Sequence, residues 1–200
     1  MAGTATNYDI LSIPQGVIAQ AWTGLAVPAA AARMTLHTDG TPDATANPSA
    51  VHLGYTDAGL TVTATETAID FNVDELAAPS GSSLESLVVN ISGTLVQVND
   101  EDVMKVLAAN FGTYSTAAGY KQLTLGFKTS ITYTSSAIIY PSPMDATKFA
   151  VFHLYSARNT AGFSFSLGRK TRAGTPFTLA GYGVSGRASA DAVGNYWWQI

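Results

Sequence analysis

The sequence contains no cysteine, so disulfide frameworks, thiolate zinc sites, iron–sulfur clusters and cysteine nucleophiles are excluded. Charged residues make up only 12% of the chain, whereas ordinary globular proteins have about 25%. Hydrophobic residues reach 46%, and this balance excludes an intrinsically disordered chain. A surface with so few charges is either rich in Ser, Thr and Gly or buried largely against other chains.

Long apolar runs and an early positive charge are also missing. No Lys or Arg precedes Arg33, and the most apolar early run, 24–32, is interrupted by Pro28. That run is shorter than the about 20 residues of a membrane span, and the N-terminus lacks a secretory signal pattern. We therefore expect a soluble protein without an export signal. Its 200 residues fit a single domain, with 1–38 as an N-terminal arm and 39–200 as the folded body.

The few charges are unevenly distributed along the chain. Up to Met104 there are twelve acidic residues and one base, Arg33, whereas nine bases and only Asp145 and Asp191 follow from Lys105 onward. Two interpretations remain open. Strands of the two halves can lie side by side and pair their charges within one fold. Alternatively, an acidic face of one copy meets the basic face of the next, a contact that closes rings or propagates as filaments.

Alternating apolar and polar residues predict mainly β structure after residue 50. Turn formers predict a loop over 38–49, a long loop over 74–86 and a basic turn over 168–174. We expect strands at 33–37, 51–55, 60–64, 69–73, 87–98, 122–127, 130–140, 149–157, 162–168 and 176–188. Many short strands with frequent turns predict an antiparallel β-sandwich or barrel.

One α-helix is predicted over about 100–111. Asn99 is a suitable N-cap, and acidic residues at 100–102 fill the first turn, where the helix dipole favours anions. The apolar residues Val103, Val106, Leu107 and Phe111 lie on one face. A helix this short is marginal alone, so we expect it to pack against the sheet.

Motifs that carry catalysis or cofactor binding are missing from the sequence. There is no Gly-x-Ser-x-Gly pentapeptide, P-loop or dinucleotide fingerprint. His37, His52 and His153 are far apart in sequence and do not form a helical metal-binding pair. We therefore expect a protein that is not an enzyme, with no catalytic residues, no cofactor and no metal.

The last residues of the sequence form an aromatic segment that contains Trp197 and Trp198. One tryptophan can cap the core from an edge strand while the other lies against a loop. Both can instead anchor an interface, since Trp is favoured at association hot spots. A platform for carbohydrate is the third alternative.

The stretch 39–62 resembles the early region of major tail tube proteins of long-tailed bacteriophages, notably those of actinobacterial hosts. In that family a Gly-Thr-x-x-Pro loop precedes a strand, and a Leu-Gly-Tyr-x-x-x-x-Gly-Leu/Val turn follows. The matching residues here are Gly40, Thr41, Leu53, Gly54, Tyr55, Gly59 and Leu60. Pro42 follows Thr41 directly, and only three residues separate Tyr55 from Gly59, so both spacings depart from the family pattern. The order of elements continues to agree to about residue 190.

The resemblance implies a subunit that forms hexameric rings, which stack into the tube through which DNA leaves the capsid. The type VI secretion tube protein is similar in fold. Expected partners are further copies of the chain, tape-measure, tail-terminator and tail-tip proteins, with DNA passing without sequence-specific binding and no membrane. The expected location is the virion tail, assembled in the host cytoplasm.

Contacts between subunits are expected at the long loop, the basic turn and the C-terminal aromatics. The candidate residues are Asp74, Glu75, Leu76, Pro79, Glu85, Arg169, Lys170, Arg172, Trp197 and Trp198. A capsid decoration or minor virion protein and a sugar-binding β-sandwich are the alternative functions.

Overall fold

The computed structural model describes residues 19–30, 32–71, 81–95, 101–110, 112–126, 128–142, 145, 147–162, 164 and 174–199. These residues form a mainly β fold with one short α-helix and one 3-10 helix. The elements are β1 (Gln20–Thr23), β2 (Val51–Phe71), β3 (Gly81–Leu95), α1 (Glu101–Leu107), β4 (Gly112–Ala117), β5 (Tyr120–Leu125), β6 (Thr134–Pro141), β7 (Phe149–Asn159), β8 (Thr175–Gly181), η1 (Ser189–Asp191) and β9 (Gly194–Trp198).

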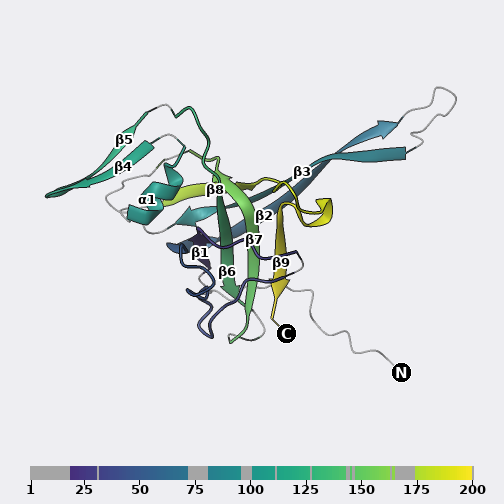
Figure 1. Cartoon of the computed structure of the whole chain (residues 1–200), viewed down its shortest axis with the longest axis horizontal. Helices are drawn as coiled ribbons and strands as arrows, with labels where there is room; N and C mark the ends of the chain where they lie inside the picture. Colours follow the sequence, from purple (N-terminus) through teal and green to yellow (C-terminus); the bar gives the residue numbers. More distant parts are fainter. Residues whose placement is uncertain are drawn as a thin grey trace.

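Six antiparallel strands close into a barrel in the order β6-β1-β2-β3-β8-β7 (Figure 1). Pairing between β6 and β7 closes it. The edge of β7 that faces away from β6 pairs with two strands. Residues 150–154 pair with β9, and residues 157–159 pair with β8. The predicted choice between sandwich and barrel is thereby settled in favour of the barrel.

The barrel interior is a packed apolar core and not a channel. Its fully buried side chains include Leu53, Ile91 and Ile138, from three different strands. Leu107 of α1 joins this cluster, and Asn159 Nδ2 donates to the Leu107 carbonyl oxygen at 3.2 Å. The predicted packing of the helix against the sheet is confirmed. An interior filled by side chains is typical of small barrels.

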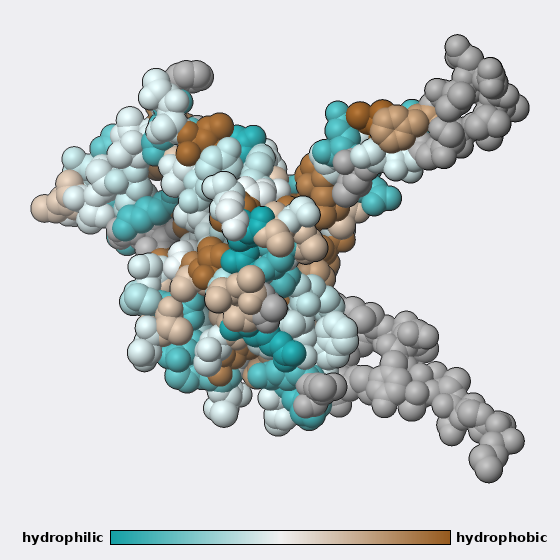
Figure 2. Space-filling model, turned by 45° about the vertical axis from the view of Figure 1, so that its right-hand side comes forward, coloured by the Kyte–Doolittle hydropathy of each residue, from teal (hydrophilic) through white to brown (hydrophobic). Residues whose placement is uncertain are grey.

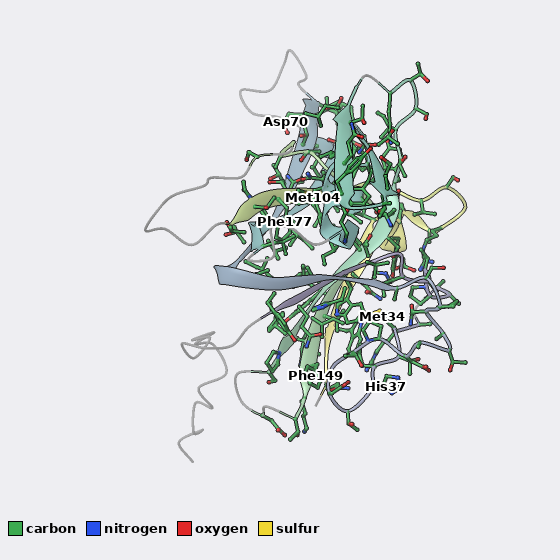
Figure 3. All side chains as sticks on the ribbon, turned by 90° about the vertical axis from the view of Figure 1, so that its left-hand side faces the viewer. Met34, His37, Asp70, Met104, Phe149 and Phe177 are labelled. Carbon is green, nitrogen blue, oxygen red and sulfur yellow. The ribbon has the colours of Figure 1, made fainter. Side chains whose placement is uncertain are left out.

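A second apolar cluster covers the outer face of β6 and β7. Residues 24–50 lie over this face, where Met34 and Leu25 pack with Ile139 and Phe149 (Figure 3). Arg187 ties this cover to the C-terminal segment, since its guanidinium donates to the Pro28 carbonyl oxygen at 2.7 Å and pairs with Asp191.

The structure corrects the predicted N-terminal arm, because residues 20–23 form the barrel strand β1. The inward side chains of β1 are the small residues Ala21 and Thr23. They give no alternation of large apolar residues, so the strand was missed. Strand β4, rich in Gly, Thr and Ser, was missed for the same reason.

Two predicted breaks between strands differ in the structure. The sequence predicts separate strands over 51–55 and 60–64, but β2 is continuous and has only a register irregularity between Asp57 and Leu60. Of the predicted loop 74–86, residues 81–86 belong to β3, and 72–80 lie outside the described residues. The serines of this segment pair through their backbone with β2 and bury little side chain, so sequence alternation did not reveal the strand. The helix ends at Leu107, short of the predicted 111.

The packing predicts that truncating a side chain inside the barrel strongly lowers the free energy of unfolding, whereas truncating one outside the barrel does not. Ile91 is 0% exposed and Ile69 is 50% exposed. Ile91→Ala is expected to lower the free energy of unfolding by about 3 kcal/mol, through lost burial and a cavity. Ile69→Ala is the matched control, expected to change it by less than about 0.5 kcal/mol. Urea unfolding of the monomer measures both, and equal losses would contradict this division.

Candidate functional site

The most unusual surface is a two-stranded arm formed by residues 63–71 of β2 and 81–88 of β3. The two strands leave the barrel together and project from it (Figures 1 and 2). On β2, pairing with β1 ends at Tyr55; on β3, pairing with β8 ends at Val89. Within the described part of the chain, the outer edges of the arm therefore pair with no strand. Such edges are templates for pairing with another chain.

Large apolar side chains are exposed on both faces of the arm. Ile69 and Phe71 are 50% and 54% exposed, and Leu87 and Val88 are 45% and 43% exposed. The register places Leu87 opposite Glu66 on one face and Val88 opposite Thr65 on the other. An isolated two-stranded ribbon is marginal in water. The arm is thus a surface suited to association.

The arm carries only negative charge among its described residues. These charges are Glu66 and Asp70 on β2 and Glu85 on β3. Glu85, predicted to flank a loop, instead lies where the register between the two strands shifts. The other predicted contact residues of the loop and the basic turn, Asp74, Glu75, Leu76, Pro79, Arg169, Lys170 and Arg172, lie outside the described residues.

The C-terminal strand β9 separates the two tryptophans. Trp197 packs against the outer apolar cluster, as a core cap would. Trp198 is 56% exposed, and its ring lies 5.4 Å from that of Tyr196, which stacks on Phe152 at 4.1 Å. An open cavity of about 480 Å³ lies beside β9, lined by Ala32, Arg33, Asp191, Asn195, Tyr196, Trp197 and Trp198.

Sequence reasoning missed a polar network around Arg187. Its guanidinium lies 4.2 Å above the Tyr155 ring, and Tyr155 donates to Asp191 at 2.9 Å. Burial, and next the Asp191 carboxylate, raises the pKa of Tyr155 to about 12. The i,i+4 spacing of Arg187 and Asp191 is the only sequence signal for the pair. The network holds the cover segment in place and offers no reactive group.

Among the described residues, a buried Ser135–His153 pair resembles a nucleophile with its activating base. Ser135 Oγ lies 2.7 Å from His153 Nε2. The residues are 8% and 1% exposed, so a substrate cannot reach the hydroxyl. Within the described chain, no carboxylate or other group hydrogen-bonds His153 Nδ1. The pair lacks the third member of a catalytic triad, and we interpret it as a structural contact.

The described residues contain no cluster of three or more His, Asp or Glu placed to bind a metal ion. None of the described helices is long and apolar enough to cross a membrane. No model of a known protein family matches the chain, and no curated protein matches it either.

Because of the buried His153, we expect the folded protein to become less stable in acid. Burial, with a smaller contribution from Arg187, lowers its pKa from 6.5 to about 4. Between these values the unfolded chain binds a proton that the folded chain does not, so stability falls as pH falls, by up to about 1.4 kcal/mol per pH unit. Urea unfolding from pH 7 to pH 4 measures this slope.

His153→Gln removes the titrating group and is expected to flatten the slope. His37→Gln, at an exposed histidine, is the control and should keep the wild-type slope. An unchanged slope in His153→Gln would show that other groups cause the acid sensitivity.

Proposed function

We propose that this protein is a structural virion subunit that self-assembles into stacked hexameric rings, forming the tail tube of a long-tailed bacteriophage. The observation that carries the proposal is the projecting arm, with two open strand edges and exposed apolar residues on both faces. Strand addition to open edges is a general mode of association between chains. The arm of each copy would then join that copy to the next one around the ring.

Because the barrel interior is filled, a conduit for DNA would have to lie between subunits. Since the interior of the six-stranded barrel is occupied by side chains such as Ile91 and Ile138, DNA cannot pass through a single subunit. A conduit must lie between subunits, where arms arranged around an axis would line it. This agrees with the family that stretch 39–62 resembles.

The partners in this proposal are further copies of the chain and the tape-measure, tail-terminator and tail-tip proteins. The tube is assembled in the host cytoplasm and resides in the virion tail. Genome DNA passes through the lumen without sequence-specific binding. The role is structural, without catalysis or cofactor.

Sugar binding is a second candidate, favoured by the cavity beside β9. Its exposed Trp198 and Tyr196 lie near Arg33 and Asp191, a combination of aromatic and polar groups that suits a pyranose. A capsid decoration protein, the remaining alternative, would form discrete oligomers and not tubes.

The proposal predicts that assembly depends on the arm. Electron microscopy of concentrated protein is expected to show six-membered rings or tubes. A variant in which Glu66 is joined to Leu87 by an Asn-Gly turn keeps the barrel pairs and loses the rest of the arm. We expect this variant to stay folded, and light scattering is expected to show that it is a monomer.

Ile69→Ser with Phe71→Ser should also weaken assembly, because both side chains are exposed on the arm. Val27→Ser, at an apolar residue that is 40% exposed on the cover segment, is the control and should assemble normally. Wild-type protein that is monomeric at all concentrations and salt conditions would refute the proposal. If sugar quenched the fluorescence of Trp198 in such a monomer, the second candidate would be favoured.

A further inference from the structure

A basic groove lies at the other end of the molecule from the arm. In Figure 1 the arm projects at one end of the longest axis, and the β4–β5 hairpin and α1 lie at the other. The arm therefore cannot reach the groove of its own chain. Any contact between the two must join different copies.

The groove is a cavity of about 360 Å³ between α1 and the hairpin. Its apolar lining includes Met104, Ala108 and Leu123, and its charged lining residues are Lys105 and Lys128. Lys128 Nζ donates to the Ala109 carbonyl oxygen at 2.7 Å, and Lys105 Nζ lies 5.7 Å from the centre of the Tyr114 ring. These contacts hold the lysines at the groove.

The hairpin extends this surface beyond the groove. The register pairs Tyr114 with Leu123 and Thr116 with Lys121, so Lys121 shares the face that lines the groove. Leu125 lies on the same face and is 63% exposed. The sequence has no Asp or Glu from residue 105 to residue 144. A positively charged surface with exposed apolar side chains results.

The arm has the complementary properties. Glu66 and Asp70 lie on one face of the arm, where Leu87 is an exposed apolar side chain opposite Glu66, whereas Ile69 and Phe71 alternate with these acids and lie on the other face. Glu85 lies at the register shift, and the described arm residues include no base. Opposite charge at two surfaces steers their encounter, and apolar residues at both supply burial. The β9 cavity, by comparison, contains both Arg33 and Asp191 and has no clear charge preference.

We propose that the arm of one copy docks onto the groove between α1 and the β4–β5 hairpin of the next copy. This inference rests on the proposed self-assembly and specifies the receiving surface. The two surfaces differ, so the contact is heterologous, and it continues from copy to copy until a ring closes or a filament extends.

Two charge-reversed proteins test the docking. The arm-reversed protein carries Glu66→Lys, Asp70→Lys and Glu85→Lys. The groove-reversed protein carries Lys105→Glu and Lys121→Glu. Each alone places like charges at every contact, and we expect at least a tenfold rise in the concentration needed for half-assembly at low salt. In a 1:1 mixture, alternating copies regain opposite charges at every contact, and assembly is expected to return.

Thermal melting checks that both proteins stay folded, and the milder Lys105→Gln with Lys121→Gln replaces the groove reversal if that variant does not fold. Lys148→Glu is the control for reversing an exposed lysine elsewhere, because Lys148 is 41% exposed beside Asp145 and does not line the groove. It should assemble like wild type.

The outcomes separate this inference from the proposed function. If wild type assembles and the reversed proteins do too, or if the mixture stays unassembled, the arm docks elsewhere and only this inference fails. If wild type and the Lys148→Glu control remain monomeric under all conditions, the proposed function fails and the docking fails with it.

Discussion

The antiparallel pairing of β2 with β3 is the interaction on which the rest of the structure depends. Val62 and Ile91 pair beside the barrel core, and Asp70 and Ser82 pair in the arm, along one ladder. The barrel therefore determines the direction of the arm. Because the neighbours β1 and β8 pair only with the barrel ends of these strands, the same ladder changes from a buried wall to an open ribbon. The same β2–β3 ladder thus forms part of the barrel wall and the arm with its open strand edges.

This division has a thermodynamic consequence. The closed barrel buries Leu53, Ile91 and Ile138 without help from another chain, so the monomer can fold first. The arm exposes Ile69 and Phe71, which gain burial only on association, at roughly 25 cal/mol per Å² of apolar surface. In the proposed ring, every contact that buries an arm would gain this free energy. On the proposed function, assembly would therefore proceed from folded subunits.

The sequence predicts the elements whose buried side chains are large and alternate. The strand with Ile138 and Ile139, the strand with Val151, and the helix with Leu107 are all found where apolar spacing indicates them. It does not predict β1, where Ala21 and Thr23 are the inward residues, or residues 81–86 of β3, whose described side chains are exposed. The acidic character of the candidate surface was visible in sequence. Its shape was not, because exposed strands carry no burial pattern.

The proposed docking would give the uneven charge of the two halves a role in contacts between copies. Basic side chains of the second half interact locally: Arg187 with Asp191 and Tyr155, Lys148 with Asp145, and Arg158 with the Tyr182 ring. Glu66 and Asp70, meanwhile, are exposed on an arm that points away from the barrel. Exposed charges more than about 10 Å apart interact little at 0.1 M salt. The acidic arm and the basic hairpin at opposite ends of one molecule therefore stabilise each other very little, and under the proposed docking their attraction would act between copies.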